Sequence, residues 1–234
     1  MTNQISSPSC RFCEKNLAHT FCNLGMSPPS NAYLSEQNLR CGETFFPLHA
    51  LVCDACKLVQ LEQFQAPSEI FSDYAYFSSY SQSWLQHSKD YVSKMISRLG
   101  LNEDSQVIEI ASNDGYLLQY FQQEGVPVLG IEPAGNVAAV AIEKGIPSTV
   151  AFFGVDTAKK LVAEGMKANL LLGNNVLAHV PDIKDFVAGM KIVLADAGTI
   201  TMEFPHLLKL MMFNQFDTIY HEHFSYLSLQ TVQK

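Results

Sequence analysis

Residues 107–118 read Val-Ile-Glu-Ile-Ala-Ser-Asn-Asp-Gly-Tyr-Leu-Leu, and this stretch decides the fold. The apolar run Val107 to Ala111 is typical of a buried strand, and Gly115 before an amphipathic run is typical of a tight turn that opens a helix. In an open parallel sheet, ligands bind beyond the carboxyl ends of the strands, where the strand order reverses. The stretch therefore predicts an α/β fold with a ligand site directly after its first strand.

The alternation of strand and helix patterns continues along the chain. We predict strands over 107–111, 128–132, 148–152, 169–172 and 199–204, and helices over 116–123, 136–144, 156–164 and 183–194. A further helix is expected over 81–100, because its apolar residues recur at helical spacing between an N-capping Ser81 or Ser83 and a terminating Gly100. Short strands that alternate with helices indicate a mostly parallel sheet with helices on both faces.

The composition restricts the possible partners. The chain has 234 residues, and its 23 acidic against 15 basic side chains give a net charge of −8, which disfavours nucleic acid because phosphates require cations. The apolar runs are too short to span a membrane. The first residues, MTNQISSPSC, have neither the basic nor the apolar region of a signal peptide. We therefore expect a cytoplasmic protein with no nucleic-acid or membrane partner, whose oligomeric state the sequence leaves open.

Four of the six cysteines form two Cys-x-x-Cys pairs, Cys10 with Cys13 and Cys53 with Cys56. Two residues between cysteines allow a tight turn to direct both sulfurs at one ion, and two such turns supply the four ligands of a structural Zn²⁺ site. An excursion such as residues 27–44 must close the long gap between the pairs. A redox pair is the alternative. Cys22 and Cys41 lie outside the pattern.

The predicted strand ends suit a nucleoside that carries a positive charge. The loop lacks the glycines that a pyrophosphate requires, and Glu109 and Asp114 flank it. Glu132 ends the second strand 132 − 109 = 23 residues after Glu109, close to the separation at which such a carboxylate binds a ribose. A ribose and a positive charge together describe S-adenosylmethionine (SAM), although an ordinary turn is the alternative. The predicted cofactor residues are Ala111, Ser112, Asn113, Asp114, Gly115, Glu132, Pro133, Asn174 and Asn175.

A polar run follows the fifth predicted strand. Residues 217–226 read Asp-Thr-Ile-Tyr-His-Glu-His-Phe-Ser-Tyr. A metal site is one interpretation, but the helical His-Glu-x-x-His pattern is absent. A general base with hydroxyl partners is favoured, because histidine titrates near neutral pH and a phenol can donate to a developing enolate oxygen. A hydrogen-bonded loop without a catalytic task is the remaining interpretation, and His179 is expected to be structural.

Together these segments resemble the nucleotide-sugar C-methyltransferases of deoxysugar biosynthesis. The resemblance rests on the two cysteine pairs and on Tyr76-Phe77-Ser78-Ser79-Tyr80-Ser81, residues 108–118, Ile131-Glu132-Pro133 and residues 220–226. It implies a zinc-binding N-terminal domain, a Rossmann-like class I SAM methyltransferase domain, and methylation beside the ketone of a dTDP-4-keto-deoxysugar, at C3. It also implies that His223 removes the C3 proton, that Glu222 orients His223 and that Tyr220 stabilises the enolate. Tyr76 and Tyr80 are candidates for closing over the cofactor or the sugar.

These interpretations predict three parts: a zinc-binding domain over 1–70, a linker and leading helix over 71–100, and an incomplete methyltransferase domain over 101–234. The family has a further C-terminal α/β domain, so we expect the chain to be a fragment that lacks the last strands of its sheet. Two rival functions remain at this point. One is a non-catalytic, zinc-containing nucleoside-binding module, and the other is a nicotinamide-dependent oxidoreductase, which only the carboxylate at the strand end favours.

Overall fold

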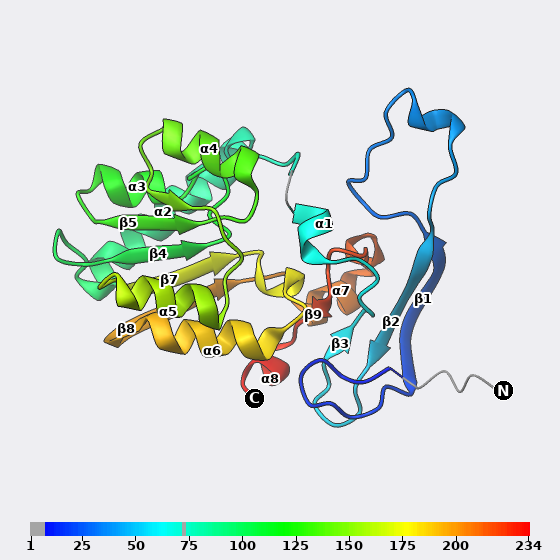
Figure 1. Cartoon of the computed structure of the whole chain (residues 1–234). Coiled ribbons are helices and arrows are strands. Elements are labelled where there is room, and N and C mark those ends of the chain that lie inside the picture. The colour runs from blue at the N-terminus through cyan, green and yellow to red at the C-terminus, as the bar shows by residue number, and fades with distance from the viewer. Residues whose placement is uncertain (1–7, 72–73) are drawn as a thin grey trace. The chain divides into compact units, whose positions relative to one another are not determined.

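A computed structural model describes residues 8–71 and 74–234, which form two compact units (Figure 1). The N-terminal unit combines the described residues up to 66 with residues 177–183 and 204–234. The α/β unit combines the described residues of 67–176 with residues 184–203. The first seven residues, which carry most of the signal-peptide argument, lie outside the described residues. The boundaries 1–70, 71–100 and 101–234 stay a prediction, while the structure places residues 204–234 in the N-terminal unit.

The α/β unit is built on a five-stranded sheet in the order β6-β5-β4-β7-β8, in which all neighbours run parallel. Its strands are β4 (Val107–Ile110), β5 (Val128–Ile131), β6 (Ser148–Thr149), β7 (Ala168–Asn174) and β8 (Leu194–Glu203). Because β4 lies between β5 and β7, the strand order reverses directly beyond its end. The predicted parallel sheet and the predicted position of its switch point are confirmed.

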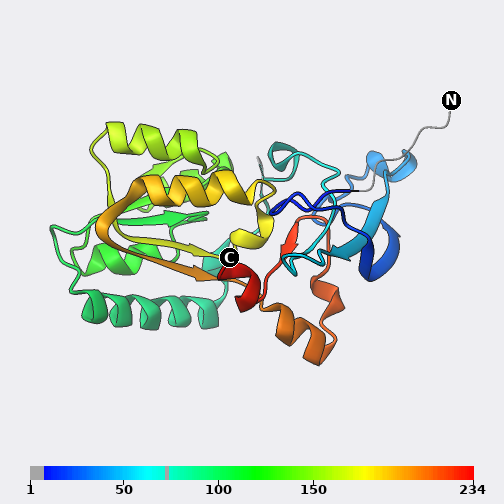
Figure 2. The ribbon, with the colours of Figure 1, turned by 90° about the horizontal axis from the view of Figure 1, so that it is seen from below.

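Helices cover both faces of this sheet. The helices of the α/β unit are α1 (Pro67–Phe71), α2 (Gln82–Leu99), α3 (Leu118–Gln123), α4 (Gly135–Glu143), α5 (Val155–Ala163) and α6 (Ile183–Val193), with a short 3₁₀ helix η2 (Ser78–Tyr80). Figures 1 and 2 show α2 and α3 on one face and α5 and α6 on the other. Ser81 caps α2 by accepting from the backbone N–H of Trp84 at 3.3 Å, and Gly100 ends α2 in the left-handed region. Both predicted caps are confirmed.

Three predicted strands differ by several residues from the observed ones. The strand expected over 169–172 is the longer β7, Ala168–Asn174. The strand expected over 148–152 is only the two-residue β6, which pairs with β5 at the edge of the sheet. The strand expected over 199–204 begins earlier, at Leu194, where it pairs with Ala168 of β7. For the two edge strands β6 and β8, the bounds depend on the residues with which they pair in the neighbouring strand. A local hydrophobic pattern does not encode this pairing.

The core of the α/β unit lies between the sheet and α2 and α3. The four residues of β4 are fully buried, and Val107 packs with Phe121 of α3 and Val92 of α2. Burial of such large apolar side chains is the main stabilising contribution to this unit. It also fixes the loop that follows β4, because the strand and α3 on either side of that loop are both held in the core.

The N-terminal unit contains an antiparallel sheet in the order β1-β2-β3-β9. Its strands are β1 (His19–Ser27), β2 (Phe46–Val52), β3 (Val59–Gln60) and β9 (Ser225–Tyr226), and its helices are α7 (Leu207–Phe213) and α8 (Leu229–Val232), with 3₁₀ helices η1 (Asn38–Arg40), η3 (Leu177–His179) and η4 (Phe216–Thr218). Strand β9 pairs with β3 through Val59↔Tyr226 and Gln60↔Ser225. The polar run 217–226 is therefore anchored to the sheet of the cysteine-rich segment.

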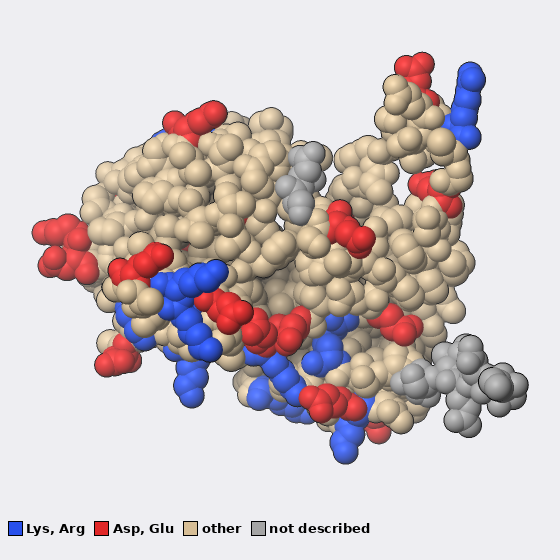
Figure 3. Space-filling model, viewed as in Figure 1, with Lys and Arg blue, Asp and Glu red and all other residues tan. Residues whose placement is uncertain are grey.

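The surface and the helix lengths complete the description. Figure 3 shows acidic and basic side chains mixed over the part of the visible face that α5 and α6 form. Among the described helices, none combines the length and the apolar character needed to cross a membrane.

Candidate functional site

The four predicted thiols converge in the N-terminal unit. The Sγ atoms of Cys10, Cys13, Cys53 and Cys56 all lie within 4.8 Å of one another. The Sγ–Sγ distance is 3.5 Å between Cys10 and Cys56 and 3.4 Å between Cys13 and Cys53. A tetrahedral Zn²⁺ with bonds of about 2.3 Å would separate its sulfurs by about 3.8 Å. The cluster therefore has the size and the donor set of a closed structural zinc site.

Both cysteine pairs form the same backbone turn. The N–H of Glu14 donates to the carbonyl of Cys10 at 2.8 Å, and the N–H of Lys57 donates to the carbonyl of Cys53 at 2.9 Å. Glu14 and Lys57, each directly after the second cysteine of its pair, have φ values of 64° and 67°. Two equivalent turns that present their thiols to one point favour metal binding over two independent redox pairs.

The loop after β4 is sharply folded. Ala111, Asn113 and Gly115 have φ values of 56°, 51° and 75°. A Cβ on Gly115 would lie 2.9 Å from Cγ1 of Ile146, so both the backbone and the space require glycine there. This geometry confirms the tight turn that the sequence predicted.

The side chain of Asn113 fastens this loop to the segment before α2. Its Oδ1 accepts from the N–H of Ser78 at 2.8 Å, and its Nδ2 donates to the carbonyl of Tyr76 at 3.1 Å. Tyr76 is half exposed, so the aromatic segment that the resemblance singles out lies directly on the loop of the α/β unit.

Glu132 organises the same loop. Its Oε2 accepts from the N–H of Asn113 at 2.9 Å, and its Oε1 accepts from the N–H of Ala134 at 2.8 Å. Burial raises the pKa of Glu132, and these two backbone hydrogen bonds oppose that shift. Each carboxylate oxygen retains capacity for a second hydrogen bond, so binding of a ribose by Glu132 stays a prediction.

Two more carboxyl groups are buried at the loop. Burial raises the pKa of Glu109 well above its ordinary range, Tyr116 opposes this shift through a hydrogen bond, and the charges of Glu132 and Asp114 add to it. Asp114 Oδ2 pairs with Lys144 Nζ at 2.9 Å and accepts from the Ser79 hydroxyl.

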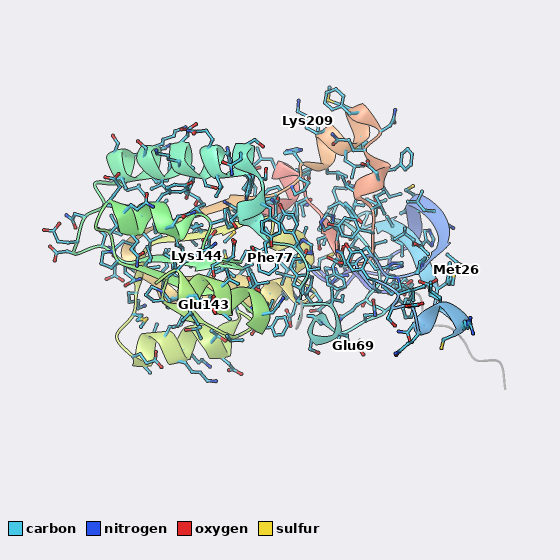
Figure 4. All side chains as sticks on the ribbon, turned by 90° about the horizontal axis from the view of Figure 1, so that it is seen from above. Met26, Glu69, Phe77, Glu143, Lys144 and Lys209 are labelled. Carbon is cyan, nitrogen blue, oxygen red and sulfur yellow. The ribbon has the colours of Figure 1, made fainter. Side chains whose placement is uncertain are left out.

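Lys144 directly follows α4, and Phe77 directly precedes the 3₁₀ helix η2. Both residues are labelled in Figure 4. Asp114 Oδ1 is buried and has no hydrogen-bond partner among the described residues, and the same is true of Ser112 Oγ. The loop thus offers an unused acceptor and an unused hydroxyl.

The remaining predicted cofactor residues lie at the ends of β5 and β7. Asn174 donates from Nδ2 to the Tyr116 hydroxyl at 3.4 Å. Asn175 has a φ of 55°, and its N–H donates to the carbonyl of Glu203 at 2.8 Å. Pro133 lies between Glu132 and Ala134, and the carboxylate of Glu132 accepts a hydrogen bond from the N–H of Ala134. All nine predicted cofactor residues therefore belong to the α/β unit.

The side chains of Tyr220 and His223 form a hydrogen-bonded pair in the N-terminal unit. The Tyr220 hydroxyl lies 2.7 Å from His223 Nε2, and His223 Nδ1 lies 2.9 Å from the carbonyl oxygen of Thr218. A carbonyl oxygen only accepts, so Nδ1 carries the ring proton of the neutral imidazole. Nε2 is then an acceptor, and the Tyr220 hydroxyl must donate to it.

Burial controls the protonation of this pair. It lowers the pKa of His223 from 6.5 to about 4, although the hydrogen bond to the Thr218 carbonyl opposes the shift. Burial raises the pKa of Tyr220 above its usual value, and the charge of Glu222 adds to this. At neutral pH the pair is therefore a phenol that donates to a neutral imidazole.

Glu222 does not hold His223 in the way that the resemblance implied. Its Oε1 accepts from Ser30 Oγ at 3.0 Å and from Asn31 Nδ2 at 2.8 Å. Burial raises the pKa of Glu222, and these two hydrogen bonds oppose the rise. The orientation of His223 comes from Thr218 and Tyr220 instead.

His179 packs against the pair. Its ring centroid lies 4.7 Å from that of His223, with the rings at 68°. Burial and, to a smaller extent, His223 lower the pKa of His179 to about 3, although a hydrogen bond with the backbone of Glu222 opposes both effects. A neutral His179 therefore adds no charge beside His223 at neutral pH.

Two protein families match the chain. Residues 10–71 match the family described as "Putative zinc binding domain", and residues 83–234, well over half of the chain, match the family described as "Methyltransferase domain". The chain belongs to the methyltransferase-domain family. All four clustered thiols of this methyltransferase lie within the zinc-binding match, and their donor set and spacing fit Zn²⁺.

Individual proteins are also similar to this methyltransferase. The C-methyltransferase NovU of Streptomyces niveus is 36% identical over 220 residues, which cover 94% of this chain and 52% of NovU. The chain thus spans about half the length of the curated relative it matches. The solved plantazolicin methyltransferase BamL, in complex with a triazolic desmethylPZN analog and SAH, has a TM-score of 0.51 at 12% identity and covers 65% of this chain and 60% of that chain. This likeness concerns the fold alone and agrees with the predicted Rossmann-like architecture.

The residues of the α/β unit fit SAM. The unused Oδ1 of Asp114 is an acceptor suited to an ammonium group, and acidic side chains favour a sulfonium. Glu132 directly follows β5, the strand next to β4, as the ribose-binding carboxylate does in nucleoside-binding sheets. No glycine-rich cradle for a pyrophosphate stands among the described residues 107–118, in agreement with the sequence-based choice of SAM over a dinucleotide.

Sequence reasoning missed several residues of these sites. Ser30 and Asn31 bind Glu222 from 192 and 191 residues away. Thr218 acts through its backbone carbonyl, which its side chain does not reveal. Lys144, the partner of Asp114, follows a helical pattern as an ordinary surface lysine would. Of these additional residues, only His179 could be singled out from the sequence, because it follows a polar break at the end of a predicted strand.

Proposed function

We propose that this methyltransferase is part of an enzyme that transfers a methyl group from SAM to a sugar carbon beside a ketone, by way of an enolate. The proposed substrate is a dTDP-4-keto-deoxysugar, and the proposed position is C3. The observation that carries the proposal is the Tyr220–His223 hydrogen bond of 2.7 Å, with the imidazole fixed by the Thr218 carbonyl. The similarity to a C-methyltransferase, NovU, supports the same reaction class.

The α/β unit is proposed to bind SAM, which supplies an electrophilic methyl group on its sulfonium. Asp114 Oδ1 accepts from the ammonium group of the cofactor, and Glu132 accepts from its ribose hydroxyls. The Lys144–Asp114 pair, at 2.9 Å, keeps the carboxylate of Asp114 in place. Asn113 holds the aromatic segment against the loop, so cofactor binding and the placement of Tyr76 depend on the same side chain.

The Tyr220–His223 pair is proposed to remove the proton from C3. Because the Tyr220 hydroxyl already occupies Nε2 of His223, the proton reaches the imidazole through the phenol. The C3–H bond breaks and its proton moves to Tyr220 Oη, while the hydroxyl proton of Tyr220 moves to His223 Nε2. The C–H electron pair forms the enolate, whose charge resides on the ketone oxygen. His223 is then the final base, and Tyr220 contacts the substrate.

Solvent deuterium exchange at C3 of a dTDP-4-keto-deoxysugar tests this function without SAM. We expect the chain to catalyse exchange, and His223→Asn and Tyr220→Phe to reduce its rate by about 10² to 10⁴. His19→Asn, which changes an exposed imidazole of the same unit, serves as the matched control. Unchanged exchange in His223→Asn would remove His223 from its proposed role.

Calorimetry with S-adenosylhomocysteine and with NAD separates the rival functions. We expect the methyl-transfer product S-adenosylhomocysteine to bind and NAD not to bind. Binding of S-adenosylhomocysteine with no C3 exchange would favour the non-catalytic nucleoside-binding module. Binding of NAD alone would favour the oxidoreductase and end the methyltransferase proposal.

A further inference from the structure

We propose that Glu222 is a neutral carboxylic acid whose Oε2 hydroxyl donates a hydrogen bond to the ketone oxygen of the substrate as the enolate forms, and that Ser30 and Asn31 are the positioning residues that direct it. The proposed donor role rests on the proposed function, because the enolate comes from that reaction. The protonation of Glu222 is a property of the chain alone and can be tested separately.

The enolate needs a donor that the Tyr220–His223 pair does not supply. Tyr220 has one hydroxyl proton, and the Thr218 carbonyl fixes the imidazole tautomer so that this proton is donated to Nε2. During proton removal the same oxygen accepts the C3 proton. Tyr220 therefore cannot donate to the ketone oxygen at the moment when negative charge develops there.

Glu222 has the geometry of a directed acid. The residue is 1% exposed, yet both of its described hydrogen-bond donors reach the same oxygen, Oε1. Oε2 is buried and has no partner among the described residues. With Oε1 accepting twice, a proton on this carboxyl belongs on Oε2, from which it can be donated to a ligand.

The charged state of Glu222 lacks compensation. Within the described part of the chain, no Lys or Arg forms an ion pair with it, and the ion pairs found involve Asp54, Glu203 and Asp114. The titratable groups that face it are Tyr220, whose pKa burial raises, and His179, which bonds to its backbone and whose pKa burial lowers. Both are neutral near pH 7. A buried carboxyl among neutral groups favours its protonated form.

Asn31 is held so that its Nδ2 donates to Oε1, and Ser30 donates to the same oxygen. Asn31 has a φ of 58°, and its Oδ1 accepts from the Tyr33 hydroxyl at 3.4 Å. That contact agrees with the amide orientation in which Nδ2 faces Glu222. Both residues lie in residues 27–44, the segment between the two cysteine pairs. This segment therefore has a role in addition to connecting the two pairs.

Infrared difference spectroscopy tests the protonation directly. The spectrum of the wild-type chain minus that of Glu222→Gln at pH 7 should contain the C=O stretch of a carboxylic acid. Glu36→Gln, at an exposed position of the same segment, is the matched control and should remove only carboxylate bands. A carboxylate band in the Glu222 difference spectrum at pH 7 would overturn the proposal.

If Ser30 and Asn31 position the Glu222 carboxyl, replacing them should change the infrared band of this carboxylic acid. The double variant Ser30→Ala and Asn31→Ala should alter the frequency and the titration of the acid band, because Oε1 loses both donors. A general loss of folding would not move this band selectively, and circular dichroism identifies such a loss. An acid band that is identical in the double variant would contradict the positioning role.

The donor role is tested by C3 exchange. Glu222→Gln keeps an N–H donor, so exchange should stay within about tenfold of wild type, whereas Glu222→Leu, which has no donor, should lose about 10² to 10³ in rate. Equal loss in both folded variants would refute donation from Oε2. An acid band together with no exchange in the wild type would contradict the proposed function while leaving the protonation of Glu222 established.

Discussion

Replacing His223 by Asn should change how the stability of the chain depends on pH. Burial lowers the pKa of His223 from 6.5 to about 4, so between these values the unfolded chain binds more protons than the folded chain. The stability associated with this group is complete above about pH 6.5 and is lost as the pH falls towards 4. At pH 5 the unfolded imidazole is mostly protonated and the folded one mostly neutral. The resulting loss between pH 7 and pH 5 is about 2 kcal/mol.

Urea unfolding followed by far-ultraviolet circular dichroism at pH 7 and pH 5 measures this loss. The wild-type free energy of unfolding should fall by about 2 kcal/mol more than that of His223→Asn, because the other titrating groups are common to both chains and cancel. Asn keeps an N–H for the Thr218 carbonyl, so the variant retains a partner for that oxygen. His19→Asn, at an exposed position, should follow the wild type. Equal pH dependence in wild type and His223→Asn would refute a buried, neutral His223.

Three further changes test other parts of the structure. Cys53→Ser should lower the zinc content measured by metal analysis, whereas Cys41→Ser, outside the cluster, should leave it unchanged. Ser81→Ala should reduce the free energy of unfolding by about 1 kcal/mol because α2 loses its N-cap, and Ser93→Ala, at an exposed position inside α2, is the comparison. Gly115→Ala should weaken S-adenosylhomocysteine binding in calorimetry and cost about 1 kcal/mol or more in stability, since φ is 75° and the new Cβ would lie 2.9 Å from Ile146. Gly42→Ala, where a Cβ meets nothing within 4 Å, is its control.

The α/β unit could be predicted from the sequence because its signals are local. Strand β4 is buried on both faces, so it is apolar except for Glu109, and the helices show the period of an amphipathic surface. Ser81 and Gly100 act within one turn of the helix ends that they cap. The cysteine pairs are also local, and each forms its turn with neighbouring backbone atoms. Such features depend on short stretches that can be recognised one at a time.

The arrangement of residues 217–226, which contain the proposed base, could not be predicted, because their partners are distant in the chain. Strand β9 has two residues and pairs with β3 across more than 160 positions, which no hydrophobic period encodes. The same limit applies to Glu222, whose donors come from Ser30 and Asn31. The sequence singled out the polar side chains of the segment as candidates, but only the strand pairing shows that they belong with the sheet of the cysteine-rich segment.

The pairing of β3 with β9 connects the cysteine cluster to the segment that contains His223, the proposed base. Gln60 donates from Nε2 to Cys10 Sγ at 3.1 Å, accepts from the N–H of Arg11 at 2.9 Å, and pairs through its backbone with Ser225, two residues after His223. The guanidinium of Arg11 also lies 5.4 Å from the centre of the Phe224 ring. Because zinc binding stabilises the folded state of its ligands, it also stabilises the residues that hold β9 in register. A Zn²⁺ held by these thiols would therefore contribute to the position of His223, the proposed base.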